Sequence, residues 1–168
     1  MLIVEKQIMI NLTHKECWMK LRDISLASNY IPGVEKIEII SSKKEGIGAT
    51  RKAYLEKGSK VVDETVIDWE NGTGFTLKLE VKGQRVLPWF NEFYFQYHIE
   101  EADHKTFFKP AILYQPRSLV MLGLQRKVFH CVLGKHLLVI CASMKSYYET
   151  NIPTSKARLK EIRKNLKS

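Results

Sequence analysis

The sequence predicts an α+β fold: an antiparallel sheet of about seven strands covered by one long C-terminal helix, with two short helices after the first strand. Two observations carry this prediction. Runs of alternating apolar and polar residues, separated by turn residues, recur from residue 34 to residue 114. Between residues 116 and 150 apolar residues recur three or four positions apart, which is helix spacing.

The N-terminal part predicts one strand, Leu2–Leu12, because its apolar residues share one parity. Thr13 and Glu16 then form the pattern of a capping box, so a short helix is expected after them. A second short helical turn is expected at residues 25–29, before Pro32-Gly33 ends it. The inner face of the first helix is predicted to contain Cys17, Trp18 and Leu21.

Turn chemistry predicts the register of the next strands after Val34–Ser42. Asn71-Gly72 is a strong signal for a hairpin with a two-residue loop, and Lys57-Gly58 is a weaker one. Both loops place Glu64 on the inner face of the sheet. The predicted cross-strand pairs are Arg51 with Glu64, Ala53 with Val62, Glu64 with Leu79, Val66 with Leu77, Val62 with Val81 and Asp68 with Phe75.

A carboxylate on an apolar inner face costs several kcal/mol unless it is paired or hydrated. One explanation is that Arg51 and Glu64 neutralise each other, or that a bulge turns them outward. The other is that this face lines a water-containing cavity in which the pair holds the polar end of a ligand. Asp68, nearer the turn, is expected to be exposed.

The rest of the sheet is predicted from residues 83–114. Residues 83–91 form a loop with large apolar side chains at Leu87, Trp89 and Phe90. Asn91–Glu100 alternates, with Phe93, Phe95, Tyr97 and Ile99 on one side. Lys105–Tyr114 is the last strand, and Pro110 predicts an edge position or a bulge in it.

The helical stretch 116–150 is longer than a domain of this size needs. We therefore expect a break or bend near Gly123 and a second near Gly134, where glycine weakens a helix and permits a close neighbour. Because apolar residues almost encircle the helix from Val128 to Met144, two apolar neighbours are expected. Lys135 and His136 interrupt this window, so a core helix is expected rather than a membrane span.

Composition limits the function. A chain of 168 residues with 45% hydrophobic content can bury one core. Residues 1–10 lack the pattern of a signal peptide, so a cytoplasmic protein is expected. The three cysteines are expected to be free and buried, and neither they nor the scattered histidines suggest a metal; no cofactor is predicted.

The net charge of +9 is concentrated in residues 153–168, where six basic residues face one acidic residue and contribute +5. We therefore divide the chain into a domain at 1–152 and a basic tail at 153–168. Thr154 or Ser155 is a candidate cap for a short helix in the tail. The tail is expected to be solvated or loosely docked, with contact to anionic lipid as the alternative. Nucleic acid is disfavoured because no aromatic residue lies among these charges.

Several segments together resemble the START-like SRPBCC superfamily, which includes polyketide cyclase/dehydrase-like and lipid-transport-like proteins. These segments are Asp23 with Tyr30–Val34, Gly46–Arg51, Val62–Trp69 and Met144–Thr150. The resemblance covers residues 2–150. It implies a helix-grip fold, in which a curved sheet wraps the C-terminal helix and leaves a hydrophobic cavity, with an acid at the position of Glu64 pointing into it. The loop at 83–91 lacks the glycine-proline gate of the plant hormone receptors in this group, so a receptor role is not expected.

The expected function is to bind or carry a small hydrophobic ligand (a lipid, quinone or polyketide-like molecule) between the sheet and the C-terminal helix. Two alternatives remain: a polyketide cyclase/dehydratase-like enzyme that uses Glu64, and a protein-interaction module with a packed core. No nucleophile elbow, phosphate loop or metal motif supports catalysis. Trp89 and Phe90 are predicted to form the entrance and to contact membrane, helped by the basic tail. Arg51 and Glu64 are predicted to meet the polar end of the ligand, and its apolar body is predicted to contact Val62, Val66, Phe75, Leu77, Leu79, Phe93, Phe95, Tyr97, Phe129, Val132, Leu133, Leu137 and Ile140.

Overall fold

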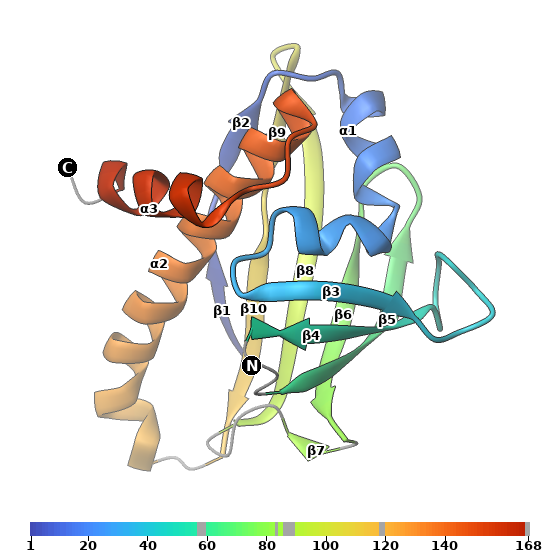
Figure 1. The fold of residues 1–168 in the computed structure, drawn as a ribbon. Helices are drawn as coiled ribbons and strands as arrows, with labels where there is room; N and C mark the ends of the chain where they lie inside the picture. Colours follow the sequence, from blue (N-terminus) through green and yellow to red (C-terminus); the bar gives the residue numbers. More distant parts are fainter. Residues whose placement is uncertain (57–59, 83, 86–89, 118–119, 167–168) are drawn as a thin grey trace.

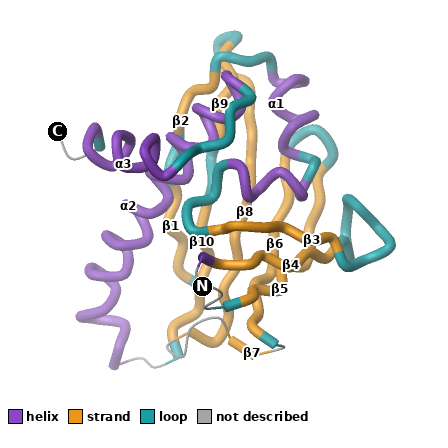
Figure 2. The backbone as a smooth tube through the Cα atoms, in the orientation of Figure 1, coloured by secondary structure: helices purple, strands orange, loops and turns teal. Residues whose placement is uncertain are grey.

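The computed structural model describes residues 1–56, 60–82, 84–85, 90–117 and 120–166. It confirms the α+β prediction: a curved antiparallel sheet packs against one long helix, α2 (Val120–Thr150), as Figure 1 and Figure 2 show. The main sheet order is β1-β10-β8-β6-β5-β4-β3, and β2, β7 and β9 pair beside this path. The strands are β1 (Leu2–Glu5), β2 (Ile8–Ile10), β3 (Val34–Ile39), β4 (Thr50–Leu55), β5 (Val61–Glu70), β6 (Gly74–Val81), β7 (Gln84–Arg85), β8 (Phe90–Ala102), β9 (Lys105–Phe108) and β10 (Ala111–Pro116).

The described residues form ten strands where about seven were expected, because two predicted strands are each divided and β7 is additional. The first division lies between β1 and β2, where the backbone N–H of Lys6 donates to the Pro110 carbonyl at 3.2 Å. The second lies at Pro110 itself, between β9 and β10. Since β8 lies on one side of this chain segment and β1 and β2 on the other, Pro110 interrupts the pairing and is not at an edge.

Both N-terminal helices form as predicted. Thr13 caps α1 (His14–Leu21): its hydroxyl accepts from the Glu16 N–H at 3.2 Å, and the Glu16 carboxylate accepts from the Thr13 N–H at 2.9 Å. Asp23 caps the 3₁₀ helix η1 (Ile24–Asn29) by accepting from the Ser25 N–H at 3.0 Å. The inner face of α1 is buried through Cys17, Trp18 and Leu21.

The β5–β6 hairpin differs from the prediction at its turn and agrees with it further along. Glu70 pairs with Gly74, so the loop has three residues, with Gly72 at a positive φ of 89°. A bulge at Ile67 absorbs the additional residue, and Val66 pairs with Leu77 and Glu64 with Leu79 as expected. Asp68 pairs with Thr76, so its predicted pairing with Phe75 is wrong; Trp69 takes that place and stacks on the Phe75 ring.

Helix α2 continues from Val120 to Thr150, so no break in the helix occurs at Gly123 or Gly134. At Gly134 the close neighbour is present, because a Cβ there would lie 3.3 Å from Cε of Lys6. The C-terminal half of α2 is buried, whereas Val128 and Val132 on its outer face are 61% and 56% exposed. The expected second apolar neighbour is therefore not found at these two valines.

Within the described residues, Val128–Thr150 is long and apolar enough to cross a membrane by length and composition, with a mean hydropathy of 1.4. The expectation concerned the shorter window Val128–Met144, and the residues up to Thr150 extend it to this length. A core helix meets the same two conditions, and 33% of the most apolar window is buried inside the protein. Leu137, Ile140 and Met144 on its inner face are buried in the core.

A final helix, α3 (Lys156–Asn165), returns across α2 (Figure 1). Ser155 caps it by accepting from the Arg158 N–H at 3.2 Å, as one of the two predicted caps. The segment before it is tied down because the Thr154 N–H donates to the Asn29 carbonyl at 2.8 Å. Ile162 is 7% exposed, so the tail helix is docked on the domain.

Candidate ligand-binding site

A buried ion pair, Arg51 with Glu64, lies at the centre of the inner face of the sheet. The two residues are cross-strand partners on β4 and β5, as the register predicted. Arg51 Nε donates to Glu64 Oε2 at 2.5 Å, and Arg51 Nη1 donates to the Ile24 carbonyl of η1. The Arg51 side chain is completely buried, while the Glu64 side chain retains 9% of its exposure. The pair is therefore internal, and the glutamate side chain keeps a small exposed fraction.

The charges of this pair stabilise each other. Burial acts to lower the pKa of Arg51, but the Glu64 carboxylate, with smaller contributions from Tyr97 and Tyr30, raises it above its ordinary value. Arg51 thus remains a cation. A buried cation of this kind must be matched by a nearby negative charge, and Glu64 is its ion-pair partner among the described residues.

Three buried tyrosines extend this polar centre from the sheet to α2. Tyr97 of β8 lies beside Arg51, Tyr30 follows η1, and Tyr148 lies on α2 with its ring perpendicular to that of Tyr30 at 5.7 Å. Burial raises the pKa of each; for Tyr97 the positive charge of Arg51 opposes that rise. All three are therefore neutral hydroxyls that can donate or accept hydrogen bonds.

Some polar atoms in this centre make no hydrogen bond of normal geometry, although Tyr97 interacts with Arg51 and Tyr30 interacts with Tyr148. Among the described residues, Arg51 Nη2 and the Tyr148 hydroxyl are buried and make no hydrogen bond of normal geometry. Leaving such a group unsatisfied costs about 1–3 kcal/mol, so buried polar groups normally have a protein, water or ligand partner. Ser143 Oγ on α2 is likewise buried and makes no hydrogen bond of normal geometry among the described residues.

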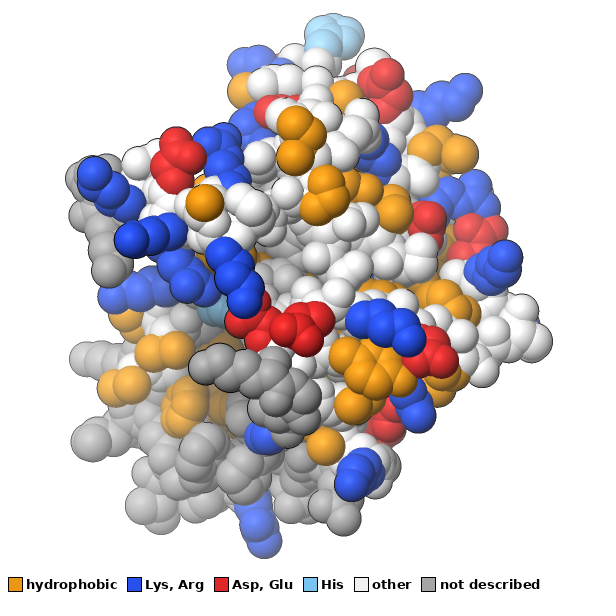
Figure 3. Space-filling model, in the orientation of Figure 1, with side chains coloured by type: hydrophobic (Ala, Val, Ile, Leu, Met, Phe, Trp, Pro, Cys, Tyr) orange, Lys and Arg blue, Asp and Glu red, His pale blue; other side chains and the backbone are white. Residues whose placement is uncertain are grey.

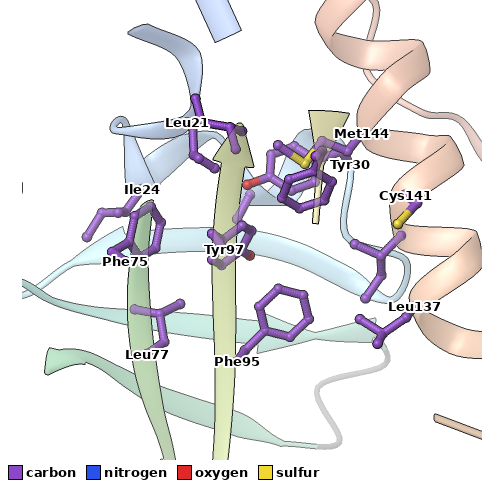
Figure 4. Close-up of a cluster of buried hydrophobic side chains, with 14 of the residues drawn as sticks. Leu21, Ile24, Tyr30, Phe75, Leu77, Phe95, Tyr97, Leu137, Cys141 and Met144 are labelled. Carbon is purple, nitrogen blue, oxygen red and sulfur yellow. The ribbon is translucent and has the colours of Figure 1, made fainter. Parts of the chain in front are cut away.

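Apolar side chains surround the polar centre, and most predicted contact residues belong to them. Figure 4 shows Leu77, Phe95 and Tyr97 of the sheet, with Leu137 of α2 facing them. These predicted residues lie together in the interior, in two groups. Val62, Val66, Phe75, Leu77, Phe95, Tyr97, Leu137 and Ile140 are buried, and Leu79, Phe93, Phe129 and Leu133 are partly buried.

The four partly buried residues lie at one edge of the interface between the sheet and α2. Leu79 and Phe93 come from the sheet, and Phe129 and Leu133 come from the N-terminal half of α2. All four face the interior and pack on its edge, yet each keeps some solvent exposure. The described interface between sheet and helix is therefore partly exposed at these four residues, whereas Leu137, Ile140 and Met144 are buried.

Three predictions about individual residues need correction. Phe90 is 2% exposed and packs on Tyr114 and Phe129, with centroid distances of 4.9 and 5.3 Å, so it is part of the core and not a membrane-facing residue. Val132 faces outward. Cys17 and Cys141 are free and buried as expected, but Cys131 is exposed. Trp89 lies outside the described residues.

The sequence reasoning missed Tyr30 and Tyr148 as members of the site. A partial signal was present for Tyr148, since its helical spacing from Leu137, Cys141 and Met144 places the four residues on one face of the helix, without deciding which face is buried. For Tyr30 the alternation of strands gave no information, because it lies in an irregular segment after η1.

Comparison with known proteins gives the same architecture. No family model matches the chain, and no curated protein matches it. A START superfamily protein from Mycobacterium smegmatis has a TM-score of 0.62 at 12% identity, over 89% of this chain and 98% of that one. Major latex-like protein 151 from Panax ginseng has a TM-score of 0.64 at 12% identity, over 87% of this chain and 96% of that one. Truncated norcoclaurine synthase from Thalictrum flavum has a TM-score of 0.63 at 14% identity, over 87% of this chain and 91% of that one. The protein therefore has the START-like, SRPBCC helix-grip fold.

Proposed function

We propose that the protein binds or carries a small hydrophobic ligand in the space between the sheet and α2. The ligand is of the lipid, quinone or polyketide-like type. Its polar end meets Arg51 and Glu64, and its apolar body contacts the interior residues named above, from Val62 to Leu137. Proteins of this fold commonly use this space for hydrophobic molecules, and the two ends of the proposed site differ in polarity in the way such a ligand requires.

One observation carries the proposal: Glu64 lies on the inner face of the sheet, paired with a fully buried Arg51, and still keeps 9% side-chain exposure. Arg51 Nη2 and the Tyr148 hydroxyl lie in the same interior and make no hydrogen bond of normal geometry among the described residues. They offer hydrogen bonds that a carbonyl, hydroxyl or quinone oxygen can complete.

Native mass spectrometry of gently purified protein, followed by organic extraction, tests this proposal directly. A co-purified lipid, quinone or polyketide-like mass identifies the ligand class. Displacement of N-phenyl-1-naphthylamine then measures affinity for that class. A protein that binds neither an extracted molecule nor the dye has a packed core, and the alternative of an interaction module then replaces this proposal.

A matched pair of variants tests the polar anchor. Glu64→Gln removes the charge with little change of shape, and Asp68→Asn makes the same change at an exposed position of the same strand. We expect Glu64→Gln to weaken binding of the extracted ligand about tenfold, the value of one charge-assisted hydrogen bond, and Asp68→Asn to leave it unchanged. Circular dichroism verifies that both variants are folded. Equal affinities for the two variants rule out the anchor.

A cyclase or dehydratase reaction is the second candidate. The observation in its favour is that the Glu64 carboxylate lies in one interior with the neutral Tyr97 hydroxyl, so that a proton acceptor and a proton donor are both present. Turnover of an aromatic polyketide or acyl substrate that is lost in Glu64→Gln supports it. Ligand release in unchanged form supports the carrier.

We place this carrier in the cytoplasm. All three cysteines are free, and Cys131 is exposed. An exposed thiol persists in a reducing compartment and is readily oxidised in a secretory one.

A further inference from the structure

The surface formed by α3 and the outer side of α2 has an unusual combination of charge and exposed apolar area. We propose that it docks the protein on an anionic lipid bilayer. The surface consists of Lys160, Arg163 and Lys164 of α3 together with Val128 and Val132 of α2, and we call it the α2–α3 face. The inference is independent of whether the interior binds a ligand.

The cations of this face are available to a partner. Within the described part of α3, five residues are basic and Glu161 is acidic. Arg158 is paired with Glu161 at 2.8 Å, and Lys156 with Glu56 at 3.3 Å. Lys160, Arg163 and Lys164 are exposed and have no ion-pair partner among the described residues.

Docking of α3 fixes the direction in which these cations point. Ile162 is buried against the domain at 7% exposure. Lys160 and Lys164 lie two positions before and after it, and at about 100° per residue they project from the opposite side of the helix. Figure 3 shows Lys and Arg side chains gathered over α3, with hydrophobic side chains on the neighbouring surface.

The apolar part of the face adjoins the charged part. Arg163 lies close enough to His136 of α2 for its charge to act on that imidazole. Val132 and Val128 lie one and two helical turns before His136, and are 56% and 61% exposed. Apolar side chains beside a row of free lysines are the pattern of an interfacial helix, in which the cations contact phosphates and the apolar groups enter the headgroup region.

Charge complementarity selects the bilayer as the occupant. The whole chain carries +9, so an anionic surface attracts it at long range, and α3 directs this attraction to one face. Nucleic acid fits less well, because α3 has no aromatic residue on which bases could stack and the exposed valines would contact a polar backbone. Phe90, which is buried, takes no part in this contact.

Co-sedimentation with phosphatidylcholine vesicles, with and without added phosphatidylserine, tests the charged part of the α2–α3 face. We expect binding to the anionic vesicles that weakens as salt rises. The double variant Lys160→Glu/Lys164→Glu should bind on the order of thirty-fold less or weaker, at about tenfold for each 1.4 kcal/mol lost. Its control is Lys15→Glu/Lys44→Glu, which makes the same change of net charge at exposed sites of α1 and the β3–β4 connection, on the other side of the view in Figure 1.

A second pair of matched variants tests the apolar part of the α2–α3 face. Val132→Ser should weaken vesicle binding several-fold, whereas Ile47→Ser, at a residue of nearly equal exposure (57%) outside this face, should not. Three results overturn the proposal: no binding to anionic vesicles, equal losses for both charge-reversal variants, or binding to an oligonucleotide with none to vesicles. The thermal melting of each variant confirms that it is folded.

Discussion

Arg51 and Glu64 are neighbours across β4 and β5, and the arginine is enclosed completely while the glutamate side chain keeps 9% of its exposure. The arginine also holds the Ile24 carbonyl, so this pair joins the sheet to the segment after α1. Removing one partner leaves an unmatched charge, which is more costly than removing both.

We therefore expect Glu64→Gln to lower the free energy of unfolding by about 3 kcal/mol, because Arg51 is then a buried cation without a counter-charge. The double variant Arg51→Met/Glu64→Gln should be more stable than Glu64→Gln. Urea unfolding of the two single variants and the double variant measures this coupling. Additive losses would show that the pair does not interact, and Asp68→Asn, at an exposed carboxylate, should change stability by about 0.5 kcal/mol or less.

Gly74 is fixed by the close approach of β8. A Cβ at this position would lie 2.1 Å from the Tyr97 carbonyl oxygen, a backbone atom that cannot rotate away. Gly74→Ala should therefore destabilise the protein by about 3 kcal/mol or more, or prevent folding. Gly134→Ala is the control, since its Cβ meets the end of the flexible Lys6 side chain and the helix gains about 1 kcal/mol in propensity. Thermal melting of both variants checks the difference in sign.

The three thiols should react at different rates with Ellman's reagent. Cys131 is exposed and should react first in native protein. Burial raises the pKa of Cys17 and of Cys141 to about 12, so both are protonated and shielded near neutral pH and should react when the protein unfolds. Release of more than one equivalent in the fast phase would show that a second thiol is accessible. The variant Cys131→Ser should lose the fast phase entirely.

The same thiols predict how stability depends on alkaline pH. In the unfolded chain a cysteine loses its proton near pH 8.5, whereas in the folded chain Cys17 and Cys141 keep theirs to about pH 12. The folded state then binds more protons, so the free energy of unfolding is constant below about pH 8.5 and falls between there and about pH 12. Urea unfolding at pH 7, 9 and 10.5 measures this slope. A flat profile would contradict it, and Cys17→Ala should reduce the slope.

Docking of α3 depends on Ile162, which is its buried contact. Ile162→Asp should release α3, so that its amides exchange rapidly with deuterium while those of β5 and β6 remain protected. Leu166→Asp introduces the same charge at a 44% exposed position and should leave exchange in α3 unchanged. Hydrogen exchange followed by mass spectrometry resolves the two segments. Equal protection in Ile162→Asp and wild type would show that other contacts hold the helix.

Much of the fold follows from local sequence signals. The β5–β6 hairpin shows their limit, because its three-residue loop and its bulge at Ile67 compensate for each other. Asn71-Gly72 predicted a two-residue loop, and the correct pairing of Val66 with Leu77 was obtained although the loop has three residues. The bulge at Ile67 restored the register, and no local signal distinguishes that isoleucine from its neighbours. The consequence was that Asp68 was paired with Phe75 in the prediction, where Trp69 lies in the structure.

The site residues on strands could be predicted from the alternation of inward and outward side chains. Those on α2 could not, because their positions depend on which side of the helix packs against the sheet. Arg51 and Glu64 followed from alternation and turn length. Along α2, apolar residues occur on every side, so spacing could not decide that Leu137 faces inward and Val132 outward. Likewise, the predicted 83–91 loop includes Phe90 because the alternating pattern begins at Asn91, whereas in the structure Phe90 starts β8 and packs against Tyr114.

The two halves of α2 are anchored unequally, with residues 137–148 enclosed by the core and Val128–His136 in contact with it along one side. Local opening of a helix requires the loss of only those contacts that the opening segment makes. The turns up to His136 can therefore separate from the sheet at a lower free energy than global unfolding, while the turns beyond Leu137 stay in place. Such fraying would transiently expose the part of the interior that Phe129 and Leu133 cover at rest.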